Sequence, residues 1–154
     1  MASGLPDYYR GVDVAYQALA QMTVRPMYGK AVLASGSKVV AANGGTYLVA
    51  VFGKGMLYGG TVWLDYTLPQ GNSEMQLWTE EVYILSLSFV RMLQYRITNP
   101  VSSVIYLNKY DTVNHIYSAG IGGGITFESY LALAYLEEHG FTPTVHYRLL
   151  YALL

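Results

Sequence analysis

From residue 27 onward, glycine, asparagine and proline divide the sequence into short apolar runs, and this spacing constrains the fold more than any other feature. The runs are rich in β-branched and aromatic residues, which favour strands over helices. The strand candidates are Tyr28–Ala34, Val39–Ala42, Thr46–Phe52, Met56–Thr67, Glu74–Thr79, Val82–Leu85, Val104–Leu107, Asn114–Ser118, Ile125–Phe127 and Thr142–Leu154. Many short strands separated by turn residues predict an all-β chain that folds as a jelly-roll-like antiparallel β-sandwich.

Local signals within these runs predict where strands end and which strand is central. Ser35-Gly36-Ser37 predicts a turn that closes the first strand, and Asn43-Gly44-Gly45 predicts the next turn. Thr46–Phe52 carries apolar residues on both faces, which predicts a central strand buried on both sides. The paired glycines Gly59-Gly60 within Met56–Thr67 predict a β-bulge or a close backbone approach.

Two segments fit more than one secondary structure. Ser86–Tyr95 carries apolar residues at helical spacing as well as at strand spacing. Ser129–Glu138 consists largely of helix-forming residues, which favours a helix. The alternation of Leu131, Leu133 and Tyr135 favours a strand instead, as do the strand-like neighbours on either side.

The first 26 residues differ in character from the rest of the chain. Met1–Arg10 reads as an extended arm, and Gly11–Met22 places apolar residues on one face of a short helix. Arg25-Pro26 ends that helix, because the residue before a proline is pushed towards extended geometry. We therefore expect an amino-terminal arm with a short helix at residues 1–26 and a β-sandwich domain at residues 27–154.

The chain carries too few charges to cover an ordinary monomer. Charged residues make up 12% of its 154 residues, against about 25% in a typical soluble domain, and hydrophobic residues make up 53%. Either a membrane or a protein partner is expected to cover such a surface. A membrane span is not expected, because Val82–Val90 is too short to cross and the charge-free stretch Thr112–Phe127 is rich in glycine and serine.

Burial against copies of the same chain is therefore the preferred explanation, and the aromatic content supports it. Sixteen tyrosines and two tryptophans supply large amphipathic rings, which are enriched at protein interfaces. The high β-propensity of tyrosine is the competing explanation for any one of these rings. The total is hard to explain by core packing alone.

No arrangement of residues indicates catalysis, a metal site or a cofactor. The chain has no cysteine, and His115, His139 and His146 lie far apart without metal-ligand spacing. The carboxylate pairs Glu80-Glu81 and Glu137-Glu138 are expected at solvated loop tips, since adjacent strand residues point to opposite faces. The net charge is −1 and the basic residues are scattered, so nucleic-acid binding is not expected either.

A series of glycine-flanked segments carries a resemblance to a known group of proteins. The segments are Gly44–Val51, Gly53–Gly60, Met75–Ile84, Gly124–Leu131 and Tyr147–Leu153. Together they resemble the β-sandwich domains of virion proteins of tailed phages and related viruses, which occur as decoration, head-fibre and tail components. The resemblance covers about residues 40–154 and consists of glycine placement and alternation. It departs from the pattern at Glu80-Glu81, where those domains carry an acidic-glycine turn.

This resemblance implies a non-enzymatic virion structural protein that assembles with itself, with a trimer as the favoured form. It implies that the protein coats or cements a viral particle by contacting a major capsid or tail protein. It also implies that Ser129–Glu138 is a strand, and that the arm contacts a neighbouring subunit or the particle. The arm residues expected at that contact are Tyr8, Tyr9, Arg10 and Tyr16. Such domains have no catalytic residues to transfer to this chain.

A second hypothesis is a carbohydrate- or receptor-binding β-sandwich module. Exposed tryptophan rings can stack on the face of a pyranose, and the candidates are Trp63 and Trp78. Asp65 lies two residues from Trp63 and so shares its strand face. These three residues form the expected ligand platform if their faces are exposed, whereas the same tryptophans would otherwise fill the core.

Overall fold

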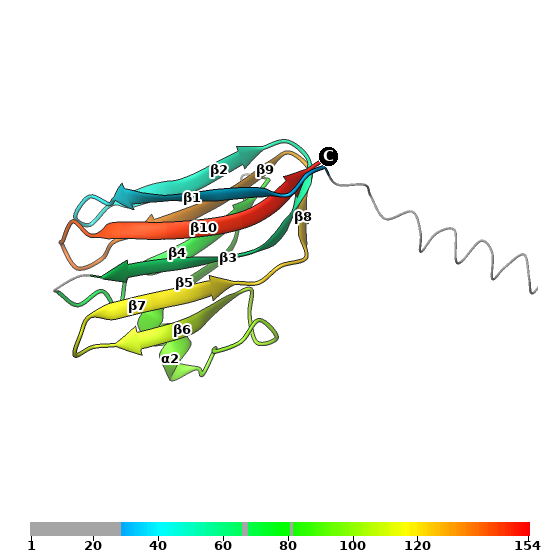
Figure 1. Cartoon of the computed structure of the whole chain (residues 1–154). Helices are drawn as coiled ribbons and strands as arrows, with labels where there is room; N and C mark the ends of the chain where they lie inside the picture. The colour runs from blue at the N-terminus through cyan, green and yellow to red at the C-terminus, as the bar shows by residue number, and fades with distance from the viewer. Residues whose placement is uncertain (1–28, 66–67, 81) are drawn as a thin grey trace, which may run out of the picture.

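The computed structural model describes residues 29–65, 68–80 and 82–154. Within these ranges, ten strands and one short helix form two antiparallel sheets packed face to face (Figure 1). The elements are β1 (Val32–Val39), β2 (Gly45–Phe52), β3 (Gly55–Asp65), β4 (Glu74–Thr79), β5 (Val82–Ser88), α2 (Phe89–Gln94), β6 (Ile105–Asp111), β7 (Ile116–Ile121), β8 (Ile125–Phe127), β9 (Tyr130–Leu136) and β10 (Thr144–Leu153). The all-β sandwich expected from the sequence is confirmed. The expected arm and helix at residues 1–26 lie outside the described residues, and so do Tyr8, Tyr9, Arg10 and Tyr16.

The pairing of strands identifies the sandwich as a jelly roll. The larger sheet has the order β1-β10-β3-β7-β6, with β8 added beside one end of β3, and the smaller sheet has the order β2-β9-β4-β5. The antiparallel pairs β1/β10, β2/β9, β3/β7 and β4/β5 join progressively closer parts of the chain. The chain therefore forms one long hairpin, with its tip between β4 and β5, that is wrapped into two sheets.

The core lies between the two sheets and is filled by alternate residues of each strand. Tyr117 of β7 and Tyr135 of β9 are among the largest side chains that are fully buried. Helix α2 closes one end of the sandwich by burying Phe89 and Met92, and the Phe89 ring lies 5.4 Å from that of Tyr117. No described helix is long and apolar enough to cross a membrane.

Both ambiguous segments have a definite structure. Ser86–Tyr95 is part strand and part helix: β5 runs to Ser88, whose side chain accepts the backbone N–H of Arg91 and caps α2. Ser129–Glu138 contains strand β9, which hydrogen-bonds to β2 on one side and β4 on the other. Pairing along both of its edges outweighs its helix propensity, because that propensity is worth only a fraction of a kcal/mol per residue.

Two expectations about strand boundaries are wrong. Ser35-Gly36-Ser37 is not a turn, because β1 runs straight through it and pairs with β10. Gly36 fits there because a Cβ atom would approach the Tyr147 hydroxyl to 3.0 Å. The separate strand expected at Val39–Ala42 is absent from the described fold, since β1 ends at Val39.

Strand β2 is an edge strand rather than a central one, because its single sheet partner is β9. Two of its outward residues, Tyr47 and Phe52, line a hollow on the outer surface of the smaller sheet, which is described below. By contrast, the bulge expected at Gly59-Gly60 is confirmed. Gly59 pairs with Leu150 and Leu57 pairs with Tyr151, which leaves Tyr58 as the extra residue of β3.

The connection between β9 and β10 is organised around a buried carboxylate, Glu137, which is 1% exposed. Its Oε2 atom accepts hydrogen bonds from the backbone N–H groups of Asn43 at 2.8 Å and Gly140 at 2.9 Å. Its Oε1 atom accepts from the His139 backbone N–H at 2.7 Å and from the Gln70 amide at 3.4 Å. The expectation that this carboxylate lies at a solvated loop tip is therefore wrong, because it joins three connections inside the fold.

Candidate binding surfaces

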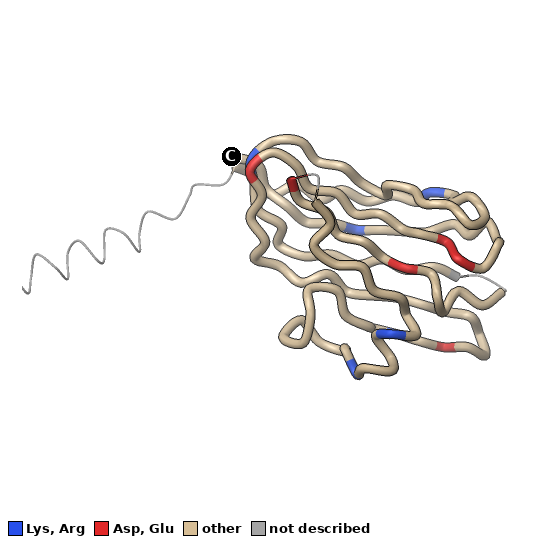
Figure 2. Tube along the Cα trace, turned by 180° about the vertical axis from the view of Figure 1, so that it is seen from behind, with Lys and Arg blue, Asp and Glu red and all other residues tan. Residues whose placement is uncertain are grey.

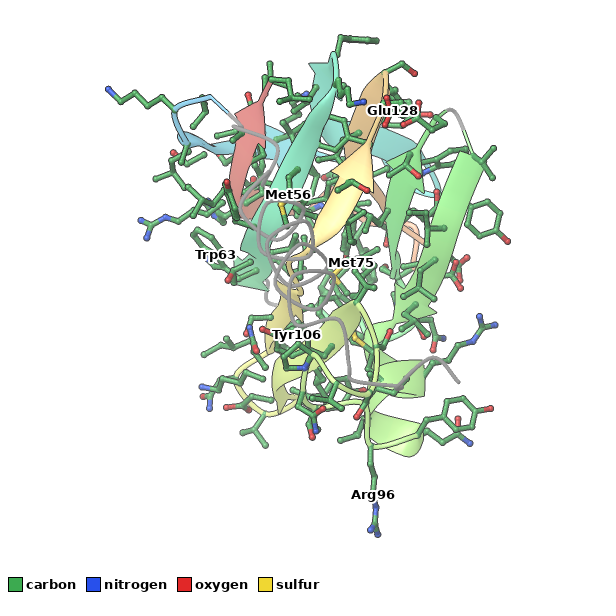
Figure 3. All side chains as sticks on the ribbon, turned by 90° about the vertical axis from the view of Figure 1, so that its right-hand side faces the viewer. Met56, Trp63, Met75, Arg96, Tyr106 and Glu128 are labelled. Atoms are coloured by element: carbon green, nitrogen blue, oxygen red, sulfur yellow. The ribbon has the colours of Figure 1, made fainter. Side chains whose placement is uncertain are left out.

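The two tryptophans expected to form one platform lie on opposite sides of the sandwich. Trp63 belongs to β3 of the larger sheet and Trp78 to β4 of the smaller sheet. Trp63 points outward from the larger sheet, whereas the side chain of Met75 of β4 is buried between the two sheets (Figure 3). The side chain of Asp65 lies outside the described part of the structure. Trp63 and Trp78 therefore belong to two separate surfaces.

The first surface, which we call the larger-sheet face, is the outer side of β1, β10, β3, β7 and β6. Near its centre is a shallow hollow of about 370 Å³ lined by Leu33, Tyr58, Gly59, Gly60, Thr61, Tyr106, Ile121, Arg148 and Leu150. The bulge in β3 turns Tyr58 outward beside this hollow. Leu33 is 60% exposed and Tyr58 is 43% exposed, so large apolar groups face solvent across neighbouring strands.

Charge is scarce on the larger-sheet face. Arg148 is the one charged residue among the described residues that line its hollow. The Arg148 guanidinium carbon lies 5.7 Å from the Trp63 ring centroid, which is within the range of a cation–π contact. Trp63 also stacks on His146, with centroids 5.4 Å apart and planes inclined by 14°. Figure 2 shows how few coloured, charged segments interrupt the trace of the whole sandwich.

The second surface, the smaller-sheet face, carries a hollow of about 350 Å³ with aromatic walls, which we call the aromatic hollow. It is lined by Tyr47 and Phe52 of β2, Trp78 of β4 and Tyr130 of β9. Phe52 is 73% exposed and Tyr47 is 48% exposed. Four rings from three adjacent strands therefore surround one depression on the outside of the sheet.

The sheet register places two small residues among these rings on the outer face. Ala50 of β2 pairs with Ala132 of β9, and Ala132 pairs in turn with Trp78 of β4. Two residues further along β2, Phe52 pairs with Tyr130. The two alanine methyl groups lie between larger neighbours on the same face, because alternate strand residues point to the same side. Ala50 is exposed on this face, whereas Ala132 is fully buried beneath its larger neighbours.

Contacts between rings hold the walls of the aromatic hollow in place. Phe52 and Tyr130 have centroids 5.2 Å apart, and Tyr47 meets Trp78 edge to face at 6.3 Å. Tyr83 of β5 supports the other side of Trp78 at 5.6 Å. Such tilted and edge-to-face arrangements are the favourable ones for aromatic pairs. The hollow is therefore built from mutually packed rings rather than from isolated side chains.

Two backbone irregularities lie beside the aromatic hollow. The ladder between β2 and β9 skips Leu48, next to Tyr47, and the ladder between β4 and β5 skips Ile84, next to Tyr83. A bulge bends its strand and re-aims neighbouring side chains. The two bulges therefore direct rings towards Trp78 from both sides.

Trp78 also presents an unsatisfied polar atom. Its indole nitrogen, Nε1, is screened from water and has no hydrogen-bond partner in the described structure. A buried donor without an acceptor costs about 1–3 kcal/mol. No charged residue is among the described side chains that line the aromatic hollow.

The remaining candidates from the sequence are spread over the fold. His115 lies in the β6–β7 turn, His139 follows β9 and His146 belongs to β10. Within the described ranges, no group of three His, Asp or Glu residues is placed to hold a metal ion.

Glu80 occupies the exposed β4–β5 turn, where its carboxylate accepts hydrogen bonds from the backbone N–H groups of Glu128 and Ser129. Hydrogen bonds from the side chain of Ser129 and the backbone of Glu128 lower the pKa of Glu80 below its ordinary value.

Sequence reasoning missed three of the four rings of the aromatic hollow, namely Tyr47, Phe52 and Tyr130. The signal was present, because Tyr47 and Phe52 lie in a run with apolar residues on both faces. That run was interpreted as a fully buried strand, whereas an aromatic outer face on an edge strand gives the same pattern. The position of Tyr130 beside Phe52 could not be predicted without knowing that β9 pairs with β2.

No protein-family model matches this chain, and no curated protein matches it at a significant level.

Proposed function

We propose that this protein is a non-enzymatic structural protein of a virion that assembles with copies of itself through the larger-sheet face. In this proposal it coats or cements the particle as a head or tail component, in contact with a major capsid or tail protein. The favoured assembly is a trimer. In a closed ring, each subunit covers its larger-sheet face against its neighbours and leaves the aromatic hollow facing outward.

The observation that carries the proposal is the exposed apolar character of the larger-sheet face. Leu33, Tyr58 and Leu150 are 60%, 43% and 40% exposed, and they surround one shallow hollow. Contiguous apolar patches of this kind mark interaction sites on soluble proteins. Arg148 and Trp63 add the residue types that dominate the binding energy of protein interfaces.

The fold is compatible with the proposal without deciding it. Jelly rolls form viral capsid proteins, but they also form lectin domains and cupins. Function must therefore be argued from the surface of the molecule and not from the topology. The scarcity of charge over the whole chain supports self-burial over the other uses of the fold.

Light scattering after size exclusion tests the self-association. We expect the full-length chain to elute as a trimer at micromolar concentration. Leu33→Lys is expected to weaken association at least tenfold, because burying a leucine contributes about 1.5–3 kcal/mol and a buried lysine charge opposes assembly. A matched control is Val101→Lys, since Val101 is 96% exposed and does not line the larger-sheet hollow.

A stable wild-type monomer would refute self-association, and an equal effect of both lysine variants would refute the assignment to this face. The virion assignment is tested separately by mass spectrometry of purified particles from the source of the gene. Peptides of this chain at a constant stoichiometry to the capsid protein are expected. Their absence from particles would refute the virion role while leaving the assembly result intact.

A further inference from the structure

We infer that the aromatic hollow of the smaller-sheet face is a carbohydrate-binding site that receives one pyranose ring. This inference goes beyond the proposed structural role, because it concerns the opposite face of the sandwich and a different class of ligand. It needs neither self-association nor a virion.

The shape of the hollow suits a flat ring with an apolar face. A pyranose presents a patch of C–H groups on one face and hydroxyl groups around its edge. The aromatic faces of Phe52, Tyr130 and Trp78 offer surfaces on which such a patch packs. The hollow between those rings has a volume of about 350 Å³.

Two polar groups belong to residues at or next to the aromatic hollow. Trp78 Nε1 is a donor without a partner in the described structure, and a ligand hydroxyl that accepts from it would remove the cost of leaving it unpaired. Its two flanking rings, Tyr47 and Tyr83, are about half exposed, and one of them must rotate before a ligand hydroxyl can reach Nε1. Gln76 lines an adjoining hollow together with Tyr47 and adds an amide beside the site. Ligand sites commonly combine mostly apolar walls with a few polar groups of this kind.

A quaternary ammonium ion is the main alternative occupant, because aromatic rings also attract cations. The carboxylates nearest along the strands are already engaged. Glu74 accepts from Arg91 at 3.1 Å and from Ser86 at 2.5 Å, and Glu80 accepts from the backbone of residues 128 and 129. No carboxylate is among the described side chains that line the hollow, so a cation there would have no counter-charge in contact, whereas a neutral sugar needs none.

A second copy of the chain is the other alternative. A stable interface covers about 800 Å² on each partner, and this surface is a confined depression rather than a broad flat area. Large exposed apolar side chains occur on both sheets, but this hollow is lined by only four described side chains. The aromatic hollow is thus better matched to a small ring than to a protein face.

The chain allows a direct optical test, because it contains only two tryptophans. In a Trp63→Phe background, all tryptophan emission comes from Trp78. This protein is titrated with the methyl glycosides of glucose, galactose, mannose and N-acetylglucosamine, and with their linear oligosaccharides. Tetramethylammonium chloride is titrated in parallel. We expect a saturable change in Trp78 emission with at least one sugar and none with tetramethylammonium.

Two variants and one control locate the site. Ala50→Leu adds bulk between Tyr47 and Phe52 on the outer face of β2 and is expected to abolish binding. Phe52→Ala removes one wall and is expected to weaken binding at least fivefold. Both residues are exposed on the edge strand β2, so the fold should be retained, as circular dichroism and thermal unfolding will check. Tyr95→Ala is the matched aromatic control, because Tyr95 is 69% exposed at the end of α2 and does not line the aromatic hollow. It should bind as the parent does.

Any of three results overturns the inference. The first is the absence of a saturable response to every sugar in the panel, and the second is a response to tetramethylammonium alone. The third is unchanged sugar binding in folded Phe52→Ala and Ala50→Leu. Leu33→Lys separates this site from self-association, since it should disturb assembly and leave sugar binding within twofold of the parent.

Discussion

Glu137→Gln removes one negative charge from the buried junction of three connections and keeps the size of the side chain. In the wild-type protein, the carboxylate accepts hydrogen bonds from the backbone N–H groups of Asn43, His139 and Gly140, at 2.7–2.9 Å. A glutamine side chain has one oxygen, which accepts hydrogen bonds, and one NH₂ group, which donates them. Wherever the NH₂ group replaces a carboxylate oxygen, it faces N–H donors instead of accepting from them. At least one buried donor then loses its acceptor.

The expected loss of stability follows from the number of buried N–H donors that lose their acceptor. The best orientation of the introduced amide keeps its oxygen on Asn43 and Gly140 and leaves the His139 N–H facing the amide NH₂ group. An unsatisfied buried donor costs about 1–3 kcal/mol, and a hydrogen bond to a charged acceptor is worth about 1.5–3 kcal/mol. We therefore expect a loss of about 2–4 kcal/mol, a large part of the roughly 5–15 kcal/mol typical of a domain. For a chain of this size, the melting temperature should fall by about 5–15 °C.

The effect should depend on pH in a definite direction. Burial raises the pKa of Glu137, but backbone hydrogen bonds from Asn43, His139, Phe141 and Gly140 lower it by more, and the net pKa lies below its ordinary value of 4.5. A carboxylate with a depressed folded pKa stabilises the fold fully above its unfolded pKa and loses that contribution as pH falls through the folded pKa. The gap between wild type and Glu137→Gln should be complete at about pH 7 and shrink below about pH 4.

Urea unfolding of both proteins at neutral pH and at a series of acidic pH values measures this gap. Glu138→Gln is the control, because it removes the same charge from the neighbouring exposed residue and should change stability by less than about 0.5 kcal/mol. A Glu137→Gln protein as stable as wild type at neutral pH would refute the role assigned to the buried carboxylate. A gap that stays constant down to about pH 3 would refute the role of its charge.

Two further predictions concern close packing and the same polar cluster. Gly60→Ala should cost about 1–3 kcal/mol in urea unfolding, because the new Cβ would lie 2.5 Å from the backbone oxygen of Arg148. Gly45→Ala, whose new Cβ would meet its nearest atom at 3.6 Å, is the tolerated comparison, and equal losses in both would contradict the packing argument. Tyr135→Phe should cost only about 0.5–1.5 kcal/mol by the same assay, because it removes the hydrogen bond that the Tyr135 hydroxyl donates to Gln70 at 3.1 Å. A loss above about 3 kcal/mol would mean that this hydroxyl does more than complete the Gln70 contact.

The fold class could be predicted from the sequence because its signals are local. Turn residues and β-branched runs act on neighbouring backbone atoms, so they predict strands without knowledge of the partner strands. Val145, Tyr147 and Leu149 alternate in the sequence and so share one face of β10, and that face packs against the core. The bulge at Gly59-Gly60 was predicted for the same reason, since paired glycines relax a strand wherever it is located.

The positions of strands within the sheets depended on pairings between residues far apart in the chain. The run Thr46–Phe52 has the same alternation whether it is central or at an edge, and only its pairing with β9 alone placed it at an edge. Ser129–Glu138 could not be assigned from its residues, because the ladders to β2 and β4 decide its conformation. Gly36 likewise predicted a turn from the sequence, whereas in the structure it lies within β1, opposite Tyr147, whose ring leaves little room for a side chain.

The candidate sites divide in the same way. Composition by itself determined that this chain is poor in charge and rich in aromatic rings, because both are counts that no folding can alter. Tertiary structure alone decided that Trp63 and Trp78 lie on opposite faces, and that Tyr47, Phe52 and Tyr130 join Trp78. It also decided that Glu137 is buried. The physical reason is that a strand's period of two predicts which residues share a face, whereas cross-strand register decides which faces and rings meet.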